Sequence, residues 1–574
     1  MPIPSQFVRR ALPLLALTLL PFSVQGAAPA RASLAQFDQF VAREMAKEKI
    51  PGLSIGYLKD GVVWAKGYGY ADLENRTPAT AQSSYRLASV TKPMTATAIL
   101  LLAEQGKLDL DAEVQTYVPY FPRKPFPITV RQLLGHLGGI NAYVDSKAEQ
   151  HFKEHKDTRQ SIAVFENFDL VAEPGTRFRY TSYGYNLLGA VIEGVSGQSY
   201  GDFMATQVWR PLAMTTIRLD DPYDLIPNRV RGYQLIDKQI KLSEFVDISS
   251  RFSAGGTRGT VIDMLRFGDA ISQGRMLSQE SRARMFTSMS TRSGELTGYG
   301  MGWGVRPIDG KFAIAHDGVQ PETSTYLFSF PSRKLTIAVA ANLQRVDTSA
   351  FARALFESVT GEAWERKVYV RDQQQRPYHL AMQAIFNQGR AHFERTHSSY
   401  TDDAPTLNQA FASINKMANH PKGELQQVLV GSYIAQVLAR KGTDLNKYSN
   451  SGSIAFISDY IALYNKDSTI APEHRFDRAF ERAVAALASH QTGTPLAPLD
   501  ASDGMDALVA SMKAAYGHAQ VYPDHMAELT TLANDFLAKG QSASARQAAR
   551  LAVEYYPDAD AAHALVKSIE GAAL

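Results

Sequence analysis

Apolar and polar positions follow two different periods near the start of the chain. Apolar residues recur at helical spacing over residues 35–49, and two short alternating runs then flank the turn Lys59-Asp60-Gly61. This pattern predicts a helix that leads into a β-hairpin. Helical spacing returns over residues 86–105, and Gly106 is a natural helix end. Ser89 is therefore expected at the start of a helix.

Helical stretches and loops then alternate from residue 109 to residue 367. Strand-like runs such as TYLFSF and KLTIAVAAN stand within residues 312–342. Strands at both ends of such a segment indicate that the first and last strands share one sheet. We expect an α+β domain over residues 27–367.

The composition changes beyond residue 367, where the chain becomes rich in alanine, glutamine and apolar residues at helical spacing. This change predicts an all-α C-terminal domain over residues 368–574. Its last stretch pairs two helices across Gly540 and resembles one tetratricopeptide unit, although a plain helical bundle fits the pattern as well. This tail could mediate self-association or bind a protein partner.

The N-terminus has the pattern of a secretory signal peptide. Two arginines at positions 9 and 10 precede an apolar run that ends near residue 24, and small residues follow at Gly26. A membrane anchor is the alternative, but the run is shorter than the ~20 residues that span a bilayer and two prolines interrupt it. We expect residues 1–26 to be removed, and a periplasmic or secreted mature protein without a transmembrane span.

Composition excludes several kinds of chemistry. The chain has no cysteine, which excludes disulfides, thiolate zinc sites and cysteine nucleophiles. Charges of both signs are mixed and the formal net charge is +3, so no nucleic-acid partner is expected. Histidine pairs with metal spacing and a third ligand are missing, as is a glycine-rich phosphate loop after a strand. We therefore expect neither a metal nor an organic cofactor.

One short motif carries candidate chemistry. Ser89 and Lys92 form an S-x-x-K pair, which places both side chains on one helix face so that a neutral lysine can take the serine proton. Ser413 and Lys416 show the same spacing but lie in the helical tail without a companion motif. Ser89 instead lies near a helix start, whose dipole favours an oxyanion. Ser413 is therefore interpreted as structural.

The segments around this motif resemble a known superfamily. YRLASVTKPMTATAILLLAEQGKLDLD resembles the nucleophile segment of class C β-lactamases, penicillin-binding proteins and serine esterases. ITVRQLLGHLGGI, PGTRFRYTSYGYNLLGAVIEGVSG, AGGTRGTVIDMLRF and YGMGWGV resemble later family stretches, and His316-Asp317-Gly318 matches the third motif. The resemblance runs in order over residues 35–342. It implies a β-lactamase-like antiparallel sheet flanked by helices and an all-helical subdomain.

The resemblance also assigns roles. Tyr180 would be a general base or proton relay, which requires nearby cations such as Lys92 to lower a tyrosine pKa from about 10. The alternative, a buried tyrosine bonded to a carbonyl, is less favoured because both flanking motifs are present. The amides of Ser89 and Val319 would form the oxyanion hole, with Gly318 allowing close approach of the substrate. His136 is expected to be a hydrogen-bonded structural histidine.

Two departures from the family pattern bear on the substrate. Ser182 stands where the second motif often has asparagine, which weakens the expectation of side-chain amide recognition. His316 and Asp317 replace a lysine and its neighbour, so the wall that would face a β-lactam carboxylate loses a permanent cation. This favours neutral or amine-bearing substrates, unless Asp317 points away from the cleft, which is equally open.

These observations predict an acyl-enzyme hydrolase for a small-molecule or peptide substrate. D-amino-acid peptides, peptidoglycan fragments and small esters are favoured over efficient β-lactam hydrolysis. The alternatives are a class C-like β-lactamase and a penicillin- or peptidoglycan-binding protein with vestigial catalysis.

Overall fold

The computed structural model describes residues 31–141, 152–365, 368–396, 404–416, 424–489, 501, 504–517, 519 and 521–572. The predicted signal peptide and the predicted domain boundary at residue 367 lie outside these ranges. None of the described helices is both long enough and apolar enough to cross a membrane.

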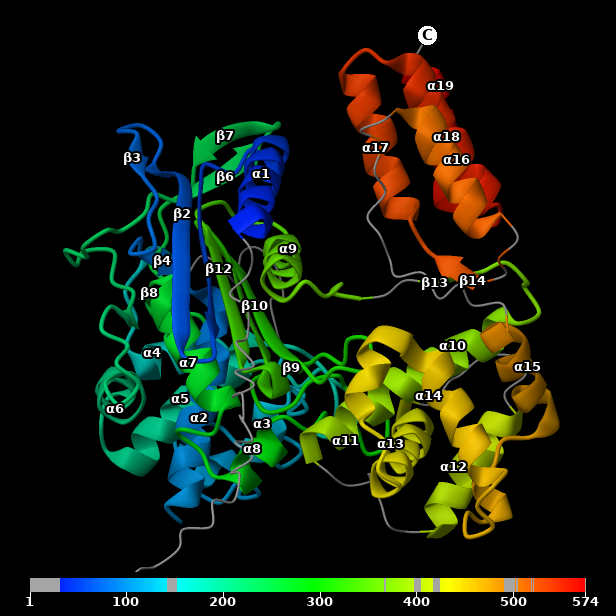
Figure 1. Cartoon of the computed structure of the whole chain (residues 1–574). Helices are drawn as coiled ribbons and strands as arrows, with labels where there is room; N and C mark the ends of the chain where they lie inside the picture. The colour runs from blue at the N-terminus through cyan, green and yellow to red at the C-terminus, as the bar shows by residue number, and fades with distance from the viewer. Residues whose placement is uncertain are drawn as a thin grey trace, which may run out of the picture.

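A seven-stranded antiparallel sheet forms the centre of the N-terminal region (Figure 1). Its strand order is β3-β2-β1-β12-β11-β10-β9. The strands are β1 (Gly52–Lys59), β2 (Val62–Asp72), β3 (Thr77–Pro78), β9 (Gly304–Val305), β10 (Ile314–Gln320), β11 (Thr323–Phe330) and β12 (Leu335–Ala341). The first long strand, β1, pairs with β12 through contacts such as Ile55 with Val339. The prediction that the first and last strands share one sheet is confirmed.

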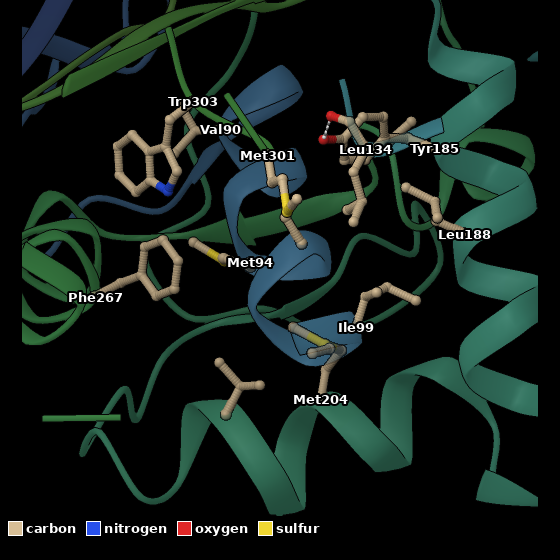
Figure 2. Packing of buried hydrophobic residues seen from close by; sticks show 14 of the residues in the cluster. Val90, Met94, Ile99, Leu134, Tyr185, Leu188, Met204, Phe267, Met301 and Trp303 are labelled. Atoms are coloured by element: carbon tan, nitrogen blue, oxygen red, sulfur yellow. Dashed lines mark hydrogen bonds between the residues drawn. The ribbon is translucent and has the colours of Figure 1, made fainter. Parts of the chain in front are cut away.

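Helices cover both faces of this sheet. α1 (Arg31–Glu48) and α9 (Thr348–Thr360) pack on one face, and they bury a cluster that includes Phe37, Phe328 and Phe356. The other face packs against α7 (Val261–Ser272), beyond which lie α2 (Thr91–Glu104) and the helical subdomain. Figure 2 shows the core of this second face, where Met94, Phe267 and Trp303 meet. The predicted α+β class is confirmed.

The helical subdomain surrounds α2 and carries further candidate site residues. Its elements are α3 (Val130–Leu134), α4 (Thr158–Ala163), α5 (Ser182–Ser196), α6 (Tyr200–Met204) and α8 (Gln279–Met285). Two small antiparallel sheets accompany it: β4 (Tyr85–Arg86), β8 (Thr257–Gly259) and β5 (Arg218–Leu219) in the order β4-β8-β5, and the hairpin β6 (Tyr233–Ile236) with β7 (Gln239–Leu242). Neither small sheet was predicted, because strands of two to four residues are too short to leave a clear periodic pattern.

The region after residue 368 is mainly helical, as predicted. The helices are α10 (Arg376–Ile385), α11 (Ala391–Thr396), α12 (Ala404–Lys416), α13 (Glu424–Arg440), α14 (Tyr448–Tyr464), α15 (Arg478–Ser489), α16 (Met505–Tyr516), α17 (Met526–Ala538), α18 (Ser542–Tyr555) and α19 (Asp560–Ala572). A short pair of strands interrupts the helices: β13 (Val368–Val370) at the start of this region pairs with β14 (Val521–Pro523), which lies between α16 and α17. α17 and α18 form the expected helix pair across Gly540, whose φ is +72°. Whether this pair is a tetratricopeptide unit stays a prediction.

Candidate active site

Ser89 lies in a single 3₁₀ turn, Ala88–Val90, immediately before α2. The preceding residue, Ala88, has a φ of +49°, which is rare for a residue with a side chain. Strand β11 holds this turn in place, because the hydroxyls of Thr323 and Thr325 donate to the carbonyls of Arg86 (3.0 Å) and Leu87 (2.8 Å). A strained backbone that neighbouring elements hold in place by hydrogen bonds is typical of functional turns. Ser89 itself remains partly exposed.

Lys92 is fully buried one helical turn from Ser89. Its Nζ lies 2.8 Å from Ser89 Oγ, 2.9 Å from the carbonyl oxygen of Ala254 and 3.4 Å from Ser182 Oγ. A neutral amine has two N–H donors and one lone pair. Donation to Ala254 and Ser182 leaves the lone pair facing the Ser89 hydroxyl. This arrangement suits removal of the serine proton.

The surroundings of Lys92 favour its neutral form. Burial lowers the pKa of Lys92 well below its ordinary value, and the positive charge of Arg251 lowers it further. Asp317 acts in the opposite direction, since its negative charge raises the pKa of Lys92, but the net shift is downward. A lysine with a lowered pKa is a recognised way to obtain a general base near neutral pH.

Tyr180 and Ser182 both lie close to Lys92; the sequence predicted this neighbourhood for Tyr180 but not for Ser182. The centre of the Tyr180 ring lies 4.8 Å from Lys92 Nζ, and α5 begins at Ser182. Thr181 caps this helix by accepting from the amide of Tyr183. Ser182 therefore occupies the position of the asparagine in the second motif and keeps a polar contact to the lysine.

His316 lies on the buried face of β10 and is held as a neutral imidazole. Its Nδ1 lies 2.6 Å from the carbonyl oxygen of Asp317, so this nitrogen carries the proton, and its Nε2 accepts from the hydroxyl of Tyr299 at 2.9 Å. Burial lowers the pKa of His316 to about 4. His316 therefore does not replace the fixed positive charge of a lysine at this position.

The remaining residues of the third motif alternate across β10. Gly318 faces the nucleophile turn, because a Cβ added there would lie 2.6 Å from the Leu87 carbonyl oxygen. Asp317 and Val319 are exposed and belong to the opposite set of side chains. Asp317 thus lies on the face that carries Ala315, away from the face of His316. This is the arrangement that the sequence left open as an alternative to an acidic cleft wall.

Strand β9 does not extend alongside the third motif of β10. It pairs only with Ile314 and Ala315, so the part of β10 from His316 to Gln320 extends past it. A substrate backbone can add to such a strand edge. The amide of Val319 stays the predicted second oxyanion donor.

His136 lies between the rings that line the site. Its Nδ1 accepts from the amide of Thr181 at 3.2 Å, and its ring centre is 4.3 Å from that of Tyr180 and 4.9 Å from that of Tyr299. Burial lowers the pKa of His136 well below its ordinary value. These contacts agree with the predicted structural role and add a specific one, the orientation of the Tyr180 ring.

Several groups at the site were not predicted. The carbonyl of Ala254 and the charge of Arg251 both act on Lys92, and Tyr299 holds His316. Ala254 and Tyr299 do lie in stretches that resemble the family, AGGTRG and YGMGWGV, so position within those stretches was the available signal. Ser413, the second S-x-x-K serine, lies in α12 of the helical region.

This fold and this constellation define the class of serine β-lactamases and penicillin-binding proteins. The family model described as Beta-lactamase matches residues 37–362, and the chain belongs to this family. Its members are serine hydrolases.

Relatives of known sequence support this assignment. The chain is 28% identical over 412 residues to the human serine beta-lactamase-like protein LACTB, mitochondrial, a match that covers 53% of this chain and 75% of that protein. It is 27% identical over 314 residues to a penicillin-binding protein of Bacillus subtilis, covering 52% and 69%. An octameric penicillin-binding protein homologue from Pyrococcus abyssi shares the fold, with a TM-score of 0.52 and 29% identity over 57% of this chain and 78% of that one.

Proposed function

We propose that the protein is an exported serine hydrolase that forms an acyl-enzyme on Ser89. The observation that carries this proposal is the position of the buried Lys92 amine, 2.8 Å from the Ser89 hydroxyl and supported by an acceptor at Ala254. Export is supported by the signal-like pattern at the N-terminus. The mature protein would act in the periplasm or outside the cell.

The proposed reaction has two steps. Ser89 Oγ attacks the substrate carbonyl while its proton moves to Lys92, and the tetrahedral oxyanion is stabilised by the amides of Ser89 and Val319. The bond to the leaving group then breaks, and the leaving group takes a proton through Tyr180 or Lys92. In the second step water attacks the acyl carbon while one of its protons moves to Lys92 or Tyr180. The bond between the acyl carbon and Ser89 Oγ then breaks and this proton passes to Oγ, which releases the acid and restores the serine hydroxyl.

The proposed substrates are D-amino-acid peptides, peptidoglycan fragments or small esters, rather than β-lactams. The main support is the neutral His316, which supplies no positive charge for a substrate carboxylate. Asp317 points to the opposite face of β10 and therefore adds no support to this choice. The lack of a positive charge at His316 favours neutral or amine-bearing substrates.

A panel of chromogenic substrates tests this proposal. We expect p-nitrophenyl acetate or D-alanine p-nitroanilide to be hydrolysed with higher kcat/KM than a penicillin, and we expect the activity to disappear in Ser89→Ala. Ser413→Ala is the matched control, because it removes the other S-x-x-K serine and should leave every rate unchanged.

Two results would contradict the proposal. Equal hydrolysis by wild type and Ser89→Ala would exclude Ser89 as the nucleophile. A wild-type protein that turns over no member of the panel but binds penicillin or peptidoglycan fragments would favour the binding protein with vestigial catalysis.

A further inference from the structure

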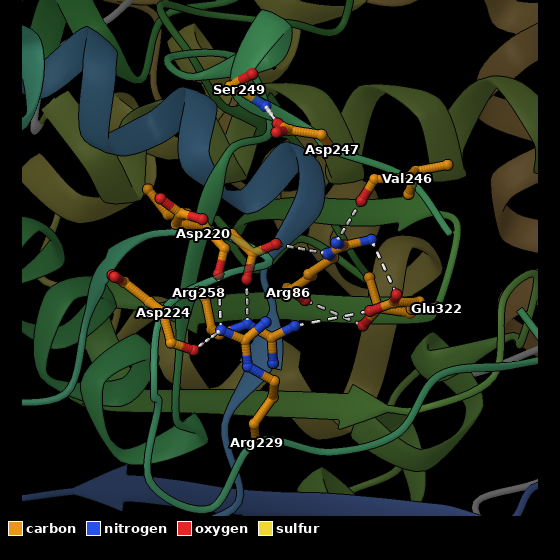
Figure 3. Close-up of polar contacts among 12 residues, drawn as sticks. Arg86, Asp220, Asp224, Arg229, Val246, Asp247, Ser249, Arg258 and Glu322 are labelled. Carbon is orange, nitrogen blue, oxygen red and sulfur yellow. Dashed lines mark hydrogen bonds and ion pairs between the residues drawn. The ribbon is translucent and has the colours of Figure 1, made fainter. Parts of the chain in front are cut away.

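Four charged residues that are largely buried, Arg86, Asp220, Arg258 and Glu322, form a cluster close in sequence to the nucleophile turn (Figure 3). Arg86 and Arg258 are directly opposite each other in the β4–β8 pair, which places two positive charges side by side. The carboxylates of Asp220 and Glu322 compensate them. The side chains of Arg86, Arg258 and Asp220 are at most 2% exposed, and that of Glu322 is 22% exposed.

Each carboxylate spans both arginines. Asp220 accepts from Arg86 Nε at 2.8 Å and from Arg258 Nε. Glu322 places Oε1 3.2 Å from Arg86 Nη1 and Oε2 3.7 Å from Arg258 Nη2. The formal charges of the four side chains sum to zero, so loss of either carboxylate leaves an uncompensated buried positive charge.

The cluster joins the elements that would bind the oxyanion. Arg86 is three residues before Ser89 in the chain, and Glu322 lies in the turn that connects β10 to β11, three residues after Val319. The ion pairs therefore tie the segment that enters the nucleophile turn to the end of the strand that carries the second amide. Further hydrogen bonds anchor the arginines, from Arg86 Nη2 to the Val246 carbonyl and from Arg258 Nη1 to the Ser84 carbonyl.

The backbone conformation of Glu322 also indicates that its side chain is held in a specific position. The register pairs Gln320 with Thr323, which leaves Pro321 and Glu322 as a two-residue loop. Glu322 has a φ of +79°, a conformation in which glycine is favoured. Its carbon stem fills the space beside Gly232, where an added Cβ would lie 2.1 Å from the Glu322 Cβ. A strained glutamate packed in this way is held where its carboxylate meets both arginines.

We propose that Glu322, together with Asp220, is a positioning residue that acts through Arg86 and Arg258 to fix the separation between the Ser89 turn and the Gly318–Val319 strand. This inference rests on the proposed function, because the fixed separation is the width of the oxyanion hole. Preorganised donors stabilise the transition state more than the bound substrate, so a wider separation lowers kcat.

Glu322→Gln in the full chain tests the inference, because glutamine keeps the size of the side chain and removes its negative charge. Glu280→Gln is the matched control, because Glu280 is an exposed carboxylate paired with Arg284 on α8. With p-nitrophenyl acetate we expect kcat of Glu322→Gln to fall between about tenfold and a hundredfold, as for small misplacements of reacting groups, while KM stays nearly constant. An unchanged kcat, or a rise in KM alone, would overturn the inference.

Hydrogen exchange separates failure of this inference from failure of the proposed function. The amides of residues 85–91 should exchange faster in Glu322→Gln than in wild type and in Glu280→Gln, whether or not the protein hydrolyses any ester. If wild type shows no turnover, the proposed function fails, while faster exchange in Glu322→Gln still supports the positioning role of Glu322. Identical exchange in all three proteins would overturn the positioning role of Glu322 even if wild type is active.

Discussion

Lys92 shows at the scale of one residue how burial and hydrogen bonding produce a base. Its amine is buried, faces two acceptors and lies 2.8 Å from Ser89 Oγ. The Ser89–Lys92 pair could be predicted from residue types at a fixed spacing. The Ala254 carbonyl could not, because every residue carries a carbonyl and only the fold determines which one reaches the amine.

The lowered pKa of Lys92 predicts how activity depends on pH. Because the pKa of Lys92 is lowered well below its ordinary value, the rate of fluorophosphonate labelling should reach its plateau well below pH 10 and fall in acid as the lone pair becomes protonated. Mass spectrometry of labelling reactions that are quenched at successive times, over a range of pH values, measures this rate. A rate that instead rose only near pH 10, the ordinary range of lysine, would contradict a neutral Lys92.

The same shift predicts a stability effect in Lys92→Met. The folded protein binds fewer protons at Lys92 than the unfolded chain between the lowered pKa and about 10.4, so wild-type stability rises with pH in that window. Lys92→Met lacks this contribution and should be more stable relative to wild type at pH 7 than at pH 10. Urea denaturation at the two pH values measures the difference, and a difference of opposite sign would contradict the assignment.

Tyr299→Phe tests the residue that holds His316. The substitution removes the hydroxyl that donates to His316 Nε2 and leaves a buried acceptor without this bond. We expect a loss of about 1–3 kcal/mol in the free energy of unfolding. Tyr70→Phe, which changes a more exposed tyrosine of β2, serves as the control and should change stability little. Equal stability of the two variants would show that the hydrogen bond between Tyr299 and His316 does not contribute to the free energy of unfolding.

At the scale of elements, the site depends on how closely β10 approaches the nucleophile turn. A Cβ at Gly318 would lie 2.3 Å from Thr325 Oγ1 and 2.6 Å from the Leu87 carbonyl oxygen. The long strands and α2 could be predicted because their apolar periods extend over many residues. The short strands β4, β5 and β8 could not, although they carry Arg86 and Arg258 of the buried cluster.

Gly318→Ala should therefore separate the strand from the turn. We expect a loss of about 1–3 kcal/mol in stability from overpacking and a reduction in labelling of Ser89 of about a hundredfold. Gly571→Ala is the control, since an added Cβ at Gly571 meets no atom within 4 Å. Differential scanning calorimetry and labelling rates measure the two effects, and wild-type labelling by Gly318→Ala would contradict this geometry.

At the scale of the whole molecule, the helical region contacts the turn that leads into β10. The amide of Gly310 donates to Asn387 Oδ1 at 2.8 Å, and Arg390 Nη1 donates to the Gly310 carbonyl at 2.8 Å. The sequence predicted a helical region but no docking surface, because these contacts join residues about 80 positions apart. The predicted boundary at residue 367 and the role of the tail stay predictions.

Arg390→Ala tests this contact between the regions. Its side chain is buried, and its removal deletes a charged hydrogen bond to Gly310, so we expect a loss of about 2–3 kcal/mol. Calorimetry of the full chain should show the transition of the helical region separating from that of the sheet domain. A single transition at the wild-type temperature would indicate that the contact contributes nothing.

The central claim is that Ser89 is a nucleophile activated by Lys92. The most direct measurement is intact mass after incubation with a fluorophosphonate, followed by tandem mass spectrometry of the modified peptide, for wild type, Ser89→Ala and Ser413→Ala. The account predicts a single adduct on Ser89 in wild type and Ser413→Ala and none in Ser89→Ala. An adduct that persists in Ser89→Ala, or a wild-type protein that takes up no reagent, would contradict it.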